Sequence, residues 1–266
     1  MENKEYLLLQ LKEIEKWEKD QKNLFIWEKI GRIPFMILDK ITPKFIHEKI
    51  GVVLDELSKY VNVGGQYLVN VPSTLTKMSK ELEIQELTEI ENVSQLSIEQ
   101  MEKASFAFIN SRKQLATVQG ATTGFGGIFT LAIDVPILLG LTLKTLQEIA
   151  ISHGYDPNDQ EERIFIIKCL QFTSSDIVGK KAILEELTNV EGKKGFSQLQ
   201  GWREVFYTYR DNMGWKKLFQ MVPIAGLIFG AYVNKQAIAD VGEAGSMLYK
   251  KRKIMDRLNE LSKQTL

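Results

Sequence analysis

Four charged residues in the second half of the chain have the types that acid–base chemistry needs. Asp134, Glu148 and Glu162 supply carboxylates, and Arg163 follows directly after the last of them. One carboxylic acid with a raised pKa can donate a proton while an ionised carboxylate accepts one or attacks as a nucleophile. These four residues therefore form a candidate catalytic set for a hydrolase or transferase.

Asp134 is the most unusual of these residues because it stands in the apolar stretch IFTLAIDVPILLGLTL. A buried carboxylate must be paired, hydrogen-bonded or protonated. The preferred interpretation is an N-cap of a helix that Pro136 opens, since proline is favoured in the first helical turn. The alternatives are a buried ion pair with Arg163 and a true functional site.

Metal, nucleotide and thiol chemistry is not indicated by the sequence. The chain has two histidines, His47 and His153, and one cysteine, Cys169, which predicts neither a zinc cluster nor a disulfide framework. The stretch GATTGFGG at 120–127 lacks the lysine of a phosphate loop. We expect no metal and no cofactor, each histidine at a capping or surface position, and Cys169 as an inert core residue.

Two segments without charge stand out, Gln114–Ile133 and Leu218–Asn234. Each joins glycines to aliphatic side chains, and they favour either central helices of a protein core or a helical hairpin seated shallowly in a membrane. Crossing a bilayer through Asp134 is disfavoured because a carboxylate costs about 2.5–3.5 kcal/mol at the membrane centre. The candidate membrane or ligand contacts are Gly124, Gly126, Gly127, Ile128, Phe129, Gly226, Ile228, Phe229 and Gly230.

Runs of charge of each sign lie outside these segments. Lys250, Lys251, Arg252 and Lys253 are consecutive and are candidates for contact with anionic lipid; the alternative is a solvated helix end. Residues 81–102 contain seven glutamates and no lysine or arginine, which favours a solvated helical face. Over the whole chain 34 basic residues balance 34 acidic ones, so no nucleic-acid partner is predicted.

The elements that must position these residues are predicted to be helices. Apolar residues recur at three- and four-residue steps over 4–30, 45–61 and 98–118, over 161–172 and 175–190, and from about 234 to 261. Ser97 and Gln100 have the spacing of a loose capping box. We expect one all-α domain over 1–266 of nine to eleven helices, with amphipathic helices in 1–110 and both glycine-rich apolar segments central in 111–266.

Two groups of motifs follow one another between about 120 and 250. In the first, the glycine-rich segment is followed by Asp134-Val135-Pro136, by QEIA at 147–150, by HGYD at 153–156 and by ERIF at 162–165. The second group is VPIAG at 222–226 with Gly230, Asn234 and Val241-Gly242. The order of these motifs resembles the EcsC family of bacterial proteins, and the second group resembles the end of that family. That family is named after the third gene of an operon that encodes an ABC transporter. The resemblance implies a largely helical bacterial protein of undefined activity and supplies no catalytic residues.

Taken together, these features favour a non-enzymatic cytoplasmic protein that associates peripherally with the inner face of the membrane. Its expected partner is the membrane surface or a membrane protein complex, such as a transport machine, and the sequence leaves its oligomeric state open. The alternatives are an enzyme with a carboxylate-based site around Asp134 and a lipid-binding helical bundle. A carboxylate cleft would favour the enzyme, and a co-purified lipid would favour the lipid-binding bundle.

Overall fold

A computed structural model of the chain describes residues 2–22, 68–124, 128–174, 177–188 and 223–264. These residues contain eight helices and no strand, which confirms the predicted all-α class. The expected helix over 45–61 lies outside the described residues, so the count of nine to eleven helices stays a prediction. No helix among the described residues is both long and apolar enough to cross a bilayer.

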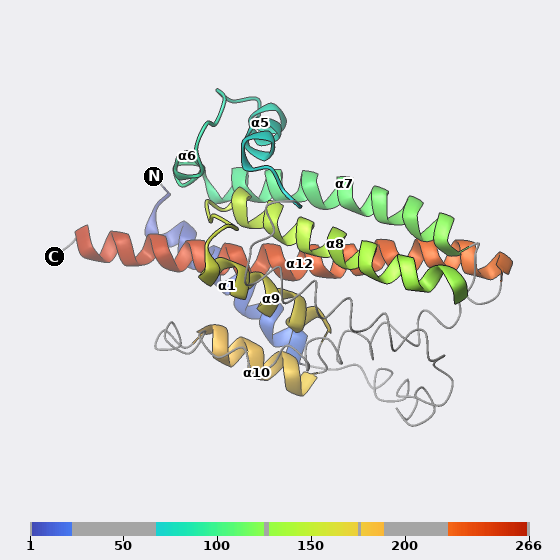
Figure 1. Cartoon of the computed structure of the whole chain (residues 1–266). Coiled ribbons are helices and arrows are strands. Elements are labelled where there is room, and N and C mark those ends of the chain that lie inside the picture. The colour runs from blue at the N-terminus through green and yellow to red at the C-terminus, as the bar shows by residue number, and fades with distance from the viewer. Residues whose placement is uncertain (1, 23–67, 125–127, 175–176, 189–222, 265–266) are drawn as a thin grey trace.

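Three long helices run side by side and form the centre of the molecule (Figure 1). They are α7 (Ile98–Gly124), α8 (Ile128–Ser152) and the 42-residue α12 (Pro223–Gln264). Helix α7 is antiparallel to α12, because Glu102 contacts Lys250 near the start of α7 whereas Gly120 meets Gly230 near its end. Antiparallel packing also relates α7 to α8.

Shorter helices cover the two sides of this central layer (Figure 1). On one side lie α1 (Lys4–Lys22), α9 (Gln160–Ser174) and α10 (Ile177–Thr188). On the other lie α5 (Val71–Leu82) and the single turn α6 (Ile90–Val93). All five pack against the half of the layer where α7 begins and α12 ends, so the other half of α7 extends beyond them.

Side-chain caps set the start of two of these helices. Asn70 caps α5 by accepting a 2.9 Å hydrogen bond from the Ser73 amide, and Pro72 stands in the first turn. Ser97 caps α7: its hydroxyl accepts from the Gln100 amide at 3.1 Å, and the Gln100 side chain accepts from the Ser97 amide at 2.9 Å. This reciprocal pair confirms the predicted capping box.

Three buried apolar clusters hold the layers together. The largest joins α7, α8, α9, α10 and α12, and the second joins α1, α5, α6, α7, α8 and α12. The third cluster is a small group on α7, α8 and α12 and consists of Ala116, Leu138 and Ile238. Among the side chains that the structure describes, most buried apolar residues therefore lie where the shorter helices cover the central layer.

Glycines allow α12 to approach its neighbours closely. A β-carbon on Gly120 would lie 2.1 Å from the Gly230 carbonyl oxygen, and one on Gly242 would lie 2.8 Å from Ile109. On the α8 side, a β-carbon on Gly245 would lie 2.7 Å from Leu146. Contacts below 3.0 Å require atoms to move, so these positions have no room for a larger side chain.

Two predicted helix boundaries are wrong. Asp134 lies inside α8, six residues after its start at Ile128, so it is not an N-cap and Pro136 does not open a helix. The C-terminal helix was expected from about residue 234 but begins at Pro223, because proline in the first turn needs no amide partner. The second glycine-rich segment and the C-terminal helix are therefore largely one element.

Candidate functional site

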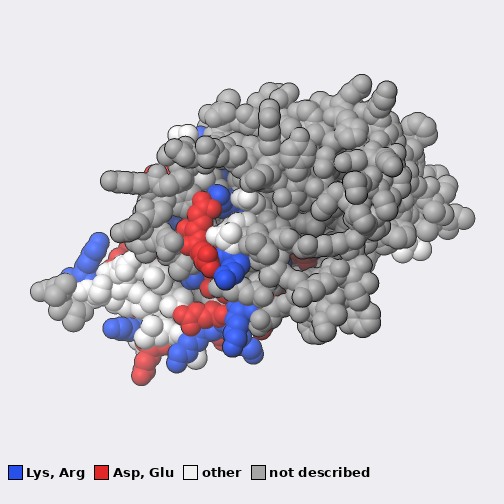
Figure 2. All heavy atoms as spheres, turned by 90° about the horizontal axis from the view of Figure 1, so that it is seen from below, with Lys and Arg blue, Asp and Glu red and all other residues white. Residues whose placement is uncertain are grey.

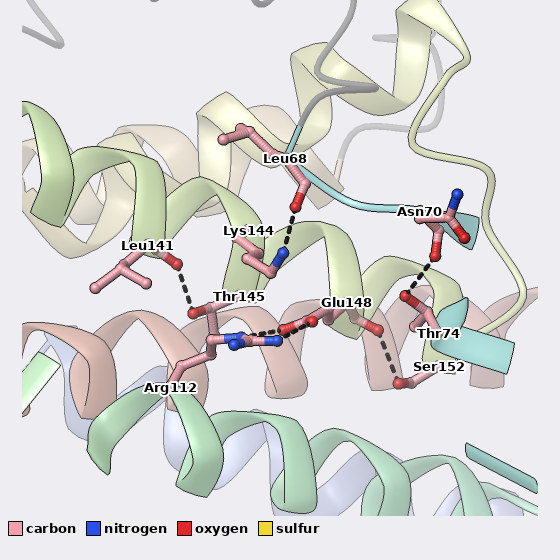
Figure 3. Close-up of polar contacts among 9 residues, drawn as sticks. All are labelled: Leu68, Asn70, Thr74, Arg112, Leu141, Lys144, Thr145, Glu148 and Ser152. Carbon is pink, nitrogen blue, oxygen red and sulfur yellow. Dashed lines mark hydrogen bonds and ion pairs between the residues drawn. The ribbon is translucent and has the colours of Figure 1, made fainter. Parts of the chain in front are cut away.

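The candidate carboxylate Glu148 lies in a buried ion pair between α7 and α8 (Figure 3). Its two oxygens accept hydrogen bonds from Arg112, one from Nε at 2.7 Å and one from Nη2 at 2.5 Å. The carboxylate is 2% exposed. A forked arginine pair of this kind satisfies both carboxylate oxygens, so Glu148 forms a contact between α7 and α8.

Lys144 lies one helical turn before Glu148 and points toward the chain that enters α5 (Figure 3). Its ammonium donates a 2.5 Å hydrogen bond to the Leu68 carbonyl oxygen. Desolvation lowers the pKa of Lys144; nearby Glu148 opposes this change, while the positive charges of Arg112 and Lys77 add to it. Lys144 thus ties residues 68–70 to α8 at the edge of the ion-paired region.

The second candidate carboxylate, Glu162, belongs to a different interface, between α9 and α12. It accepts hydrogen bonds from the Tyr249 hydroxyl and, at 2.7 Å, from Arg252. Burial raises the pKa of Glu162, while Arg252 and Tyr249 lower it by stabilising the ionised form. The Arg252 guanidinium also lies 4.1 Å from the centre of the Tyr155 ring, which suits a desolvated cation.

His153 completes this polar group from the end of α8. It is fully buried, its ring stacks on Tyr249 with centroids 5.8 Å apart, and Nδ1 lies 2.8 Å from the Ile149 carbonyl oxygen. Its Nε2 has no hydrogen-bond partner among the described residues. Burial lowers the pKa of His153 to about 4. The expectation of a capping or surface histidine is therefore wrong for His153, and His47 lies outside the described residues.

The four consecutive cations of α12 contact different parts of the fold. Lys250 pairs with Glu102 of α7 at 2.9 Å, Lys251 with Glu18 of α1 at 2.7 Å, and Arg252 with Glu162 of α9. The ammonium of Lys253 lies 5.4 Å from the ring centre of Tyr155, a residue that follows α8. Desolvation lowers the pKa of Lys253. Lys250 and Lys253 are buried, so the run does not form an open basic surface.

The predicted catalytic set is not brought together in the described structure. Glu148 and Glu162 bind different arginines at different interfaces. Arg163 donates to the Asn158 carbonyl oxygen, and the side chain of Asp134 lies outside the described residues. Cys169 is buried, which raises the pKa of its thiol and fits the predicted inert role. Within the described ranges no group of histidine, cysteine or carboxylate side chains could hold a metal.

The far end of the three long helices has a different character, and we call it the tip. It comprises residues 114–124 of α7, 128–143 of α8 and 223–234 of α12, and Asp134 is its one charged residue. Large apolar side chains on all three helices remain between 45% and 71% exposed there. They are Leu115, Val118, Ile137, Ile228 and Tyr232.

Three threonine hydroxyls in the tip are satisfied by backbone carbonyls of their own helix. The hydroxyl of Thr117 donates to the Lys113 carbonyl oxygen at 2.7 Å, and the hydroxyls of Thr122 and Thr123 donate to the Gln119 carbonyl oxygen at 2.8 and 2.9 Å. Such bonds let a threonine lie in an apolar environment without an external partner. The tip is therefore less polar than its residue types suggest.

The candidate membrane contacts that the structure describes all lie in the tip. Ile228 is exposed and Gly230 is buried against Gly120. Gly124 ends α7, and Gly226 lies in the first turns of α12. The remaining candidates lie outside the described residues, or only their backbone is described: Gly126, Gly127, Ile128, Phe129 and Phe229.

Sequence reasoning missed the partners of the two carboxylates. Arg112 had a detectable signal, because it falls in the series 101, 105, 108, 112, 116 on α7, whose other members are buried and uncharged. A charge at such a position indicates a buried pair. Tyr249 carried no comparable signal, since a tyrosine in a helical apolar series is typical of a core.

Comparison with known proteins places the chain in a family. The sequence pattern of the EcsC protein family matches residues 9–254. The chain belongs to the EcsC family. It is 50% identical over 267 residues to the uncharacterized protein YdbA of Bacillus subtilis strain 168, covering 99% of this chain and 98% of the relative.

A second relative is Protein EcsC of the same organism, which is 30% identical over 174 residues, or 65% of this chain and 72% of the relative. No solved structure matches. The family match extends well beyond residues 120–250, which contain the motifs that resemble the family, and it includes most of α1.

Proposed function

We propose that this EcsC-family protein is a non-enzymatic protein that associates peripherally with a membrane or with a membrane transport machine, and that the tip makes the contact. The observation that carries the proposal is the set of exposed apolar side chains on all three helices of a nearly uncharged end. Proteins in water seldom leave such apolar surface open unless it binds something.

The distribution of charge supports this orientation. We call the ion-paired remainder of the molecule, where α1, α9 and α10 cover the central layer, the base. On the face seen in Figure 2, described acidic and basic side chains lie next to one another. The pairs Lys168–Glu186 at 2.8 Å and Lys181–Glu185 at 3.9 Å belong to this part. A surface of mixed charge suits water, so the base would stay outside the membrane.

The state of the carboxylates favours a structural role over catalysis for Glu148 and Glu162. Each is ion-paired with an arginine inside the protein, and Glu162 also accepts a bond from Tyr249. A general acid or base must reach the proton that it transfers. Both carboxylates instead have their oxygens occupied by neighbouring helices.

Flotation with inside-out vesicles of the Bacillus subtilis cytoplasmic membrane tests the proposal, because these vesicles contain both lipid and membrane proteins. We expect the wild-type protein to float with the vesicles and Ile228→Ser/Tyr232→Ser to remain in the dense fraction. Leu9→Ser is the matched control, since Leu9 is an exposed apolar residue of α1 in the base, and it should float like the wild type. Recovery of the wild type in the dense fraction would contradict the proposal.

A further inference from the structure

On each of the three long helices, the first charged residue next to the tip is a lysine. These residues are Lys113 on α7, Lys144 on α8 and Lys235 on α12. We call them the lysine collar. They come from three segments that are far apart in the sequence, so their common position is a property of the fold.

Helix register places the collar at one level along the bundle. Gly120 of α7 meets Gly230 of α12. Lys113 lies seven residues before Gly120, and Lys235 lies five residues after Gly230. Because the two helices are antiparallel, the positions of Lys113 and Lys235 along the bundle axis differ by about 3 Å. Lys144 lies one turn before Glu148, whose partner Arg112 is adjacent to Lys113. All three lysines thus lie within about one to two helical turns of one another.

The collar has few acidic neighbours. No described carboxylate lies within ion-pair distance of Lys113 or Lys235, whereas the cations of the base at 250–252 are all paired. Lys235 is exposed, Lys113 is half-buried, and Lys144 bonds to a backbone carbonyl. The collar therefore adds net positive charge at the boundary between base and tip.

Negative charge is concentrated toward the opposite end of α7. The exposed glutamates of the 81–102 stretch lie on α5, α6, the connecting loops and the first turn of α7 (Figure 1). They are Glu81, Glu83, Glu86, Glu89, Glu91 and Glu99. An anionic surface would attract the collar and repel this acidic end, which orients the long axis with the tip toward that surface.

We infer that the tip inserts into the acyl layer of one leaflet of an anionic bilayer, with the lysine collar at the level of the lipid headgroups. This inference rests on the proposed function and names its partner as lipid. The tip residues span about 16 Å on α7, about 18 Å on α12 and about 24 Å on α8, each shorter than a hydrocarbon core of about 30 Å. Lysines at such a boundary can extend to the headgroups.

Protein-free liposomes separate this inference from the proposed function. We expect co-sedimentation with vesicles of 70% phosphatidylcholine and 30% phosphatidylglycerol, little binding to pure phosphatidylcholine, and weakening at higher salt. Lys113→Gln/Lys235→Gln should lower the partition coefficient by about 25-fold, as each lysine near the surface contributes about a factor of five. Lys12→Gln/Lys19→Gln, which removes two exposed lysines of α1, is the matched control and should bind like the wild type.

The depth to which the tip enters the bilayer is measured with a nitroxide label attached to Val118→Cys in the tip. The control is the same label attached to Phe106→Cys in the base. Both positions are exposed on α7. On binding, the label at 118 should become accessible to oxygen and shielded from a water-soluble nickel chelate, while the label at 106 should stay in water.

Each outcome decides between the two proposals. Binding to native vesicles without binding to liposomes would overturn the lipid inference, keep the proposed function and identify a membrane protein as the partner. Failure to bind either would overturn both. Equal binding to neutral and anionic liposomes, or a label at 118 that stays in water, would overturn the inference alone.

Discussion

The base and the tip share the same three helices but are stabilised by different interactions. In the base, buried charges join helices: Arg112 to Glu148, Lys250 to Glu102 and Arg252 to Glu162. In the tip, α7 and α12 meet through two glycine backbones, and the shared apolar cluster is small. Buried ion pairs specify which helices are neighbours, because a mispaired charge is costly, whereas backbone contact between glycines leaves the outer faces free for other side chains.

The largest expected effect concerns the base. Glu148→Gln should lower the free energy of unfolding by about 3–5 kcal/mol, because it leaves the buried Arg112 without its counter-ion. Urea denaturation measures this loss. Arg112→Met/Glu148→Leu is the control: replacing both partners by apolar side chains should recover most of the stability. A loss below about 1 kcal/mol in the single variant would show that water reaches this pair.

The next effect is a pH dependence that also belongs to the base. His153 is neutral in the folded protein, with its pKa lowered by burial to about 4 from 6.5, and Lys253, Lys250 and Arg257 oppose its protonation. Between these values the unfolded chain binds a proton that the folded protein does not, so stability decreases as the pH falls from about 6.5 to about 4. One pH unit corresponds to about 1.4 kcal/mol, so the loss approaches about 3 kcal/mol.

Unfolding measured over this range in the wild type and in His153→Gln isolates the contribution. Carboxylates titrate in both proteins, so their effect cancels in the difference. We expect the pH dependence to be flatter in His153→Gln between pH 6.5 and 4.5. Parallel curves would mean that His153 takes up its proton in the folded state.

A smaller effect is expected in the tip. Gly120→Ala would place its β-carbon 2.1 Å from a backbone oxygen of α12, and overpacking of this kind costs about 1–3 kcal/mol. Gly140→Ala on α8 is the matched control, because its β-carbon would lie 3.9 Å from the Leu68 side chain, an ordinary van der Waals contact. Alanine there should be neutral or stabilising by up to about 1 kcal/mol. Equal thermal melting temperatures for the two variants would refute close contact at Gly120.

The smallest effect concerns Asp134, the one charge of the tip. Asp134→Asn should increase partition into anionic liposomes by a few-fold, because an ionised carboxylate is costly in an acyl layer and the cost decreases toward the interface. Co-sedimentation measures the change, with Asp240→Asn, on α12 in the base, as control. Reduced binding of Asp134→Asn would show that the carboxylate itself is needed at the membrane.

Local patterns in the sequence were sufficient for four of the described helices and for one cap. The three- and four-residue periodicity identified α1, α7, α9 and α10, and the spacing of Ser97 and Gln100 identified the start of α7. Pro136 gave a wrong helix start, since it lies inside α8. A proline signals a boundary only when no surrounding packing maintains the helix.

The site depended on contacts that no local pattern contains. Lys250 to Lys253 looked like a surface patch because consecutive charges usually lie in water. Successive residues of a helix are about 100° apart, so four of them point around its whole circumference. On a helix that is surrounded by α7, α1 and α9, they therefore reach different neighbours. His153 was missed for a similar reason, because its burial depends on Tyr249 of a distant helix.

The length of α12 has a mechanical consequence. A single helix of 42 residues is about 63 Å long, and it joins Pro223 in the tip to the cations in the base without a joint. A hydrogen-bonded helix resists compression along its axis, so a force applied to its first turn is transmitted along the whole helix. A displacement of the tip would therefore act at once on Lys250 and Arg252, and through them on α7 and α9.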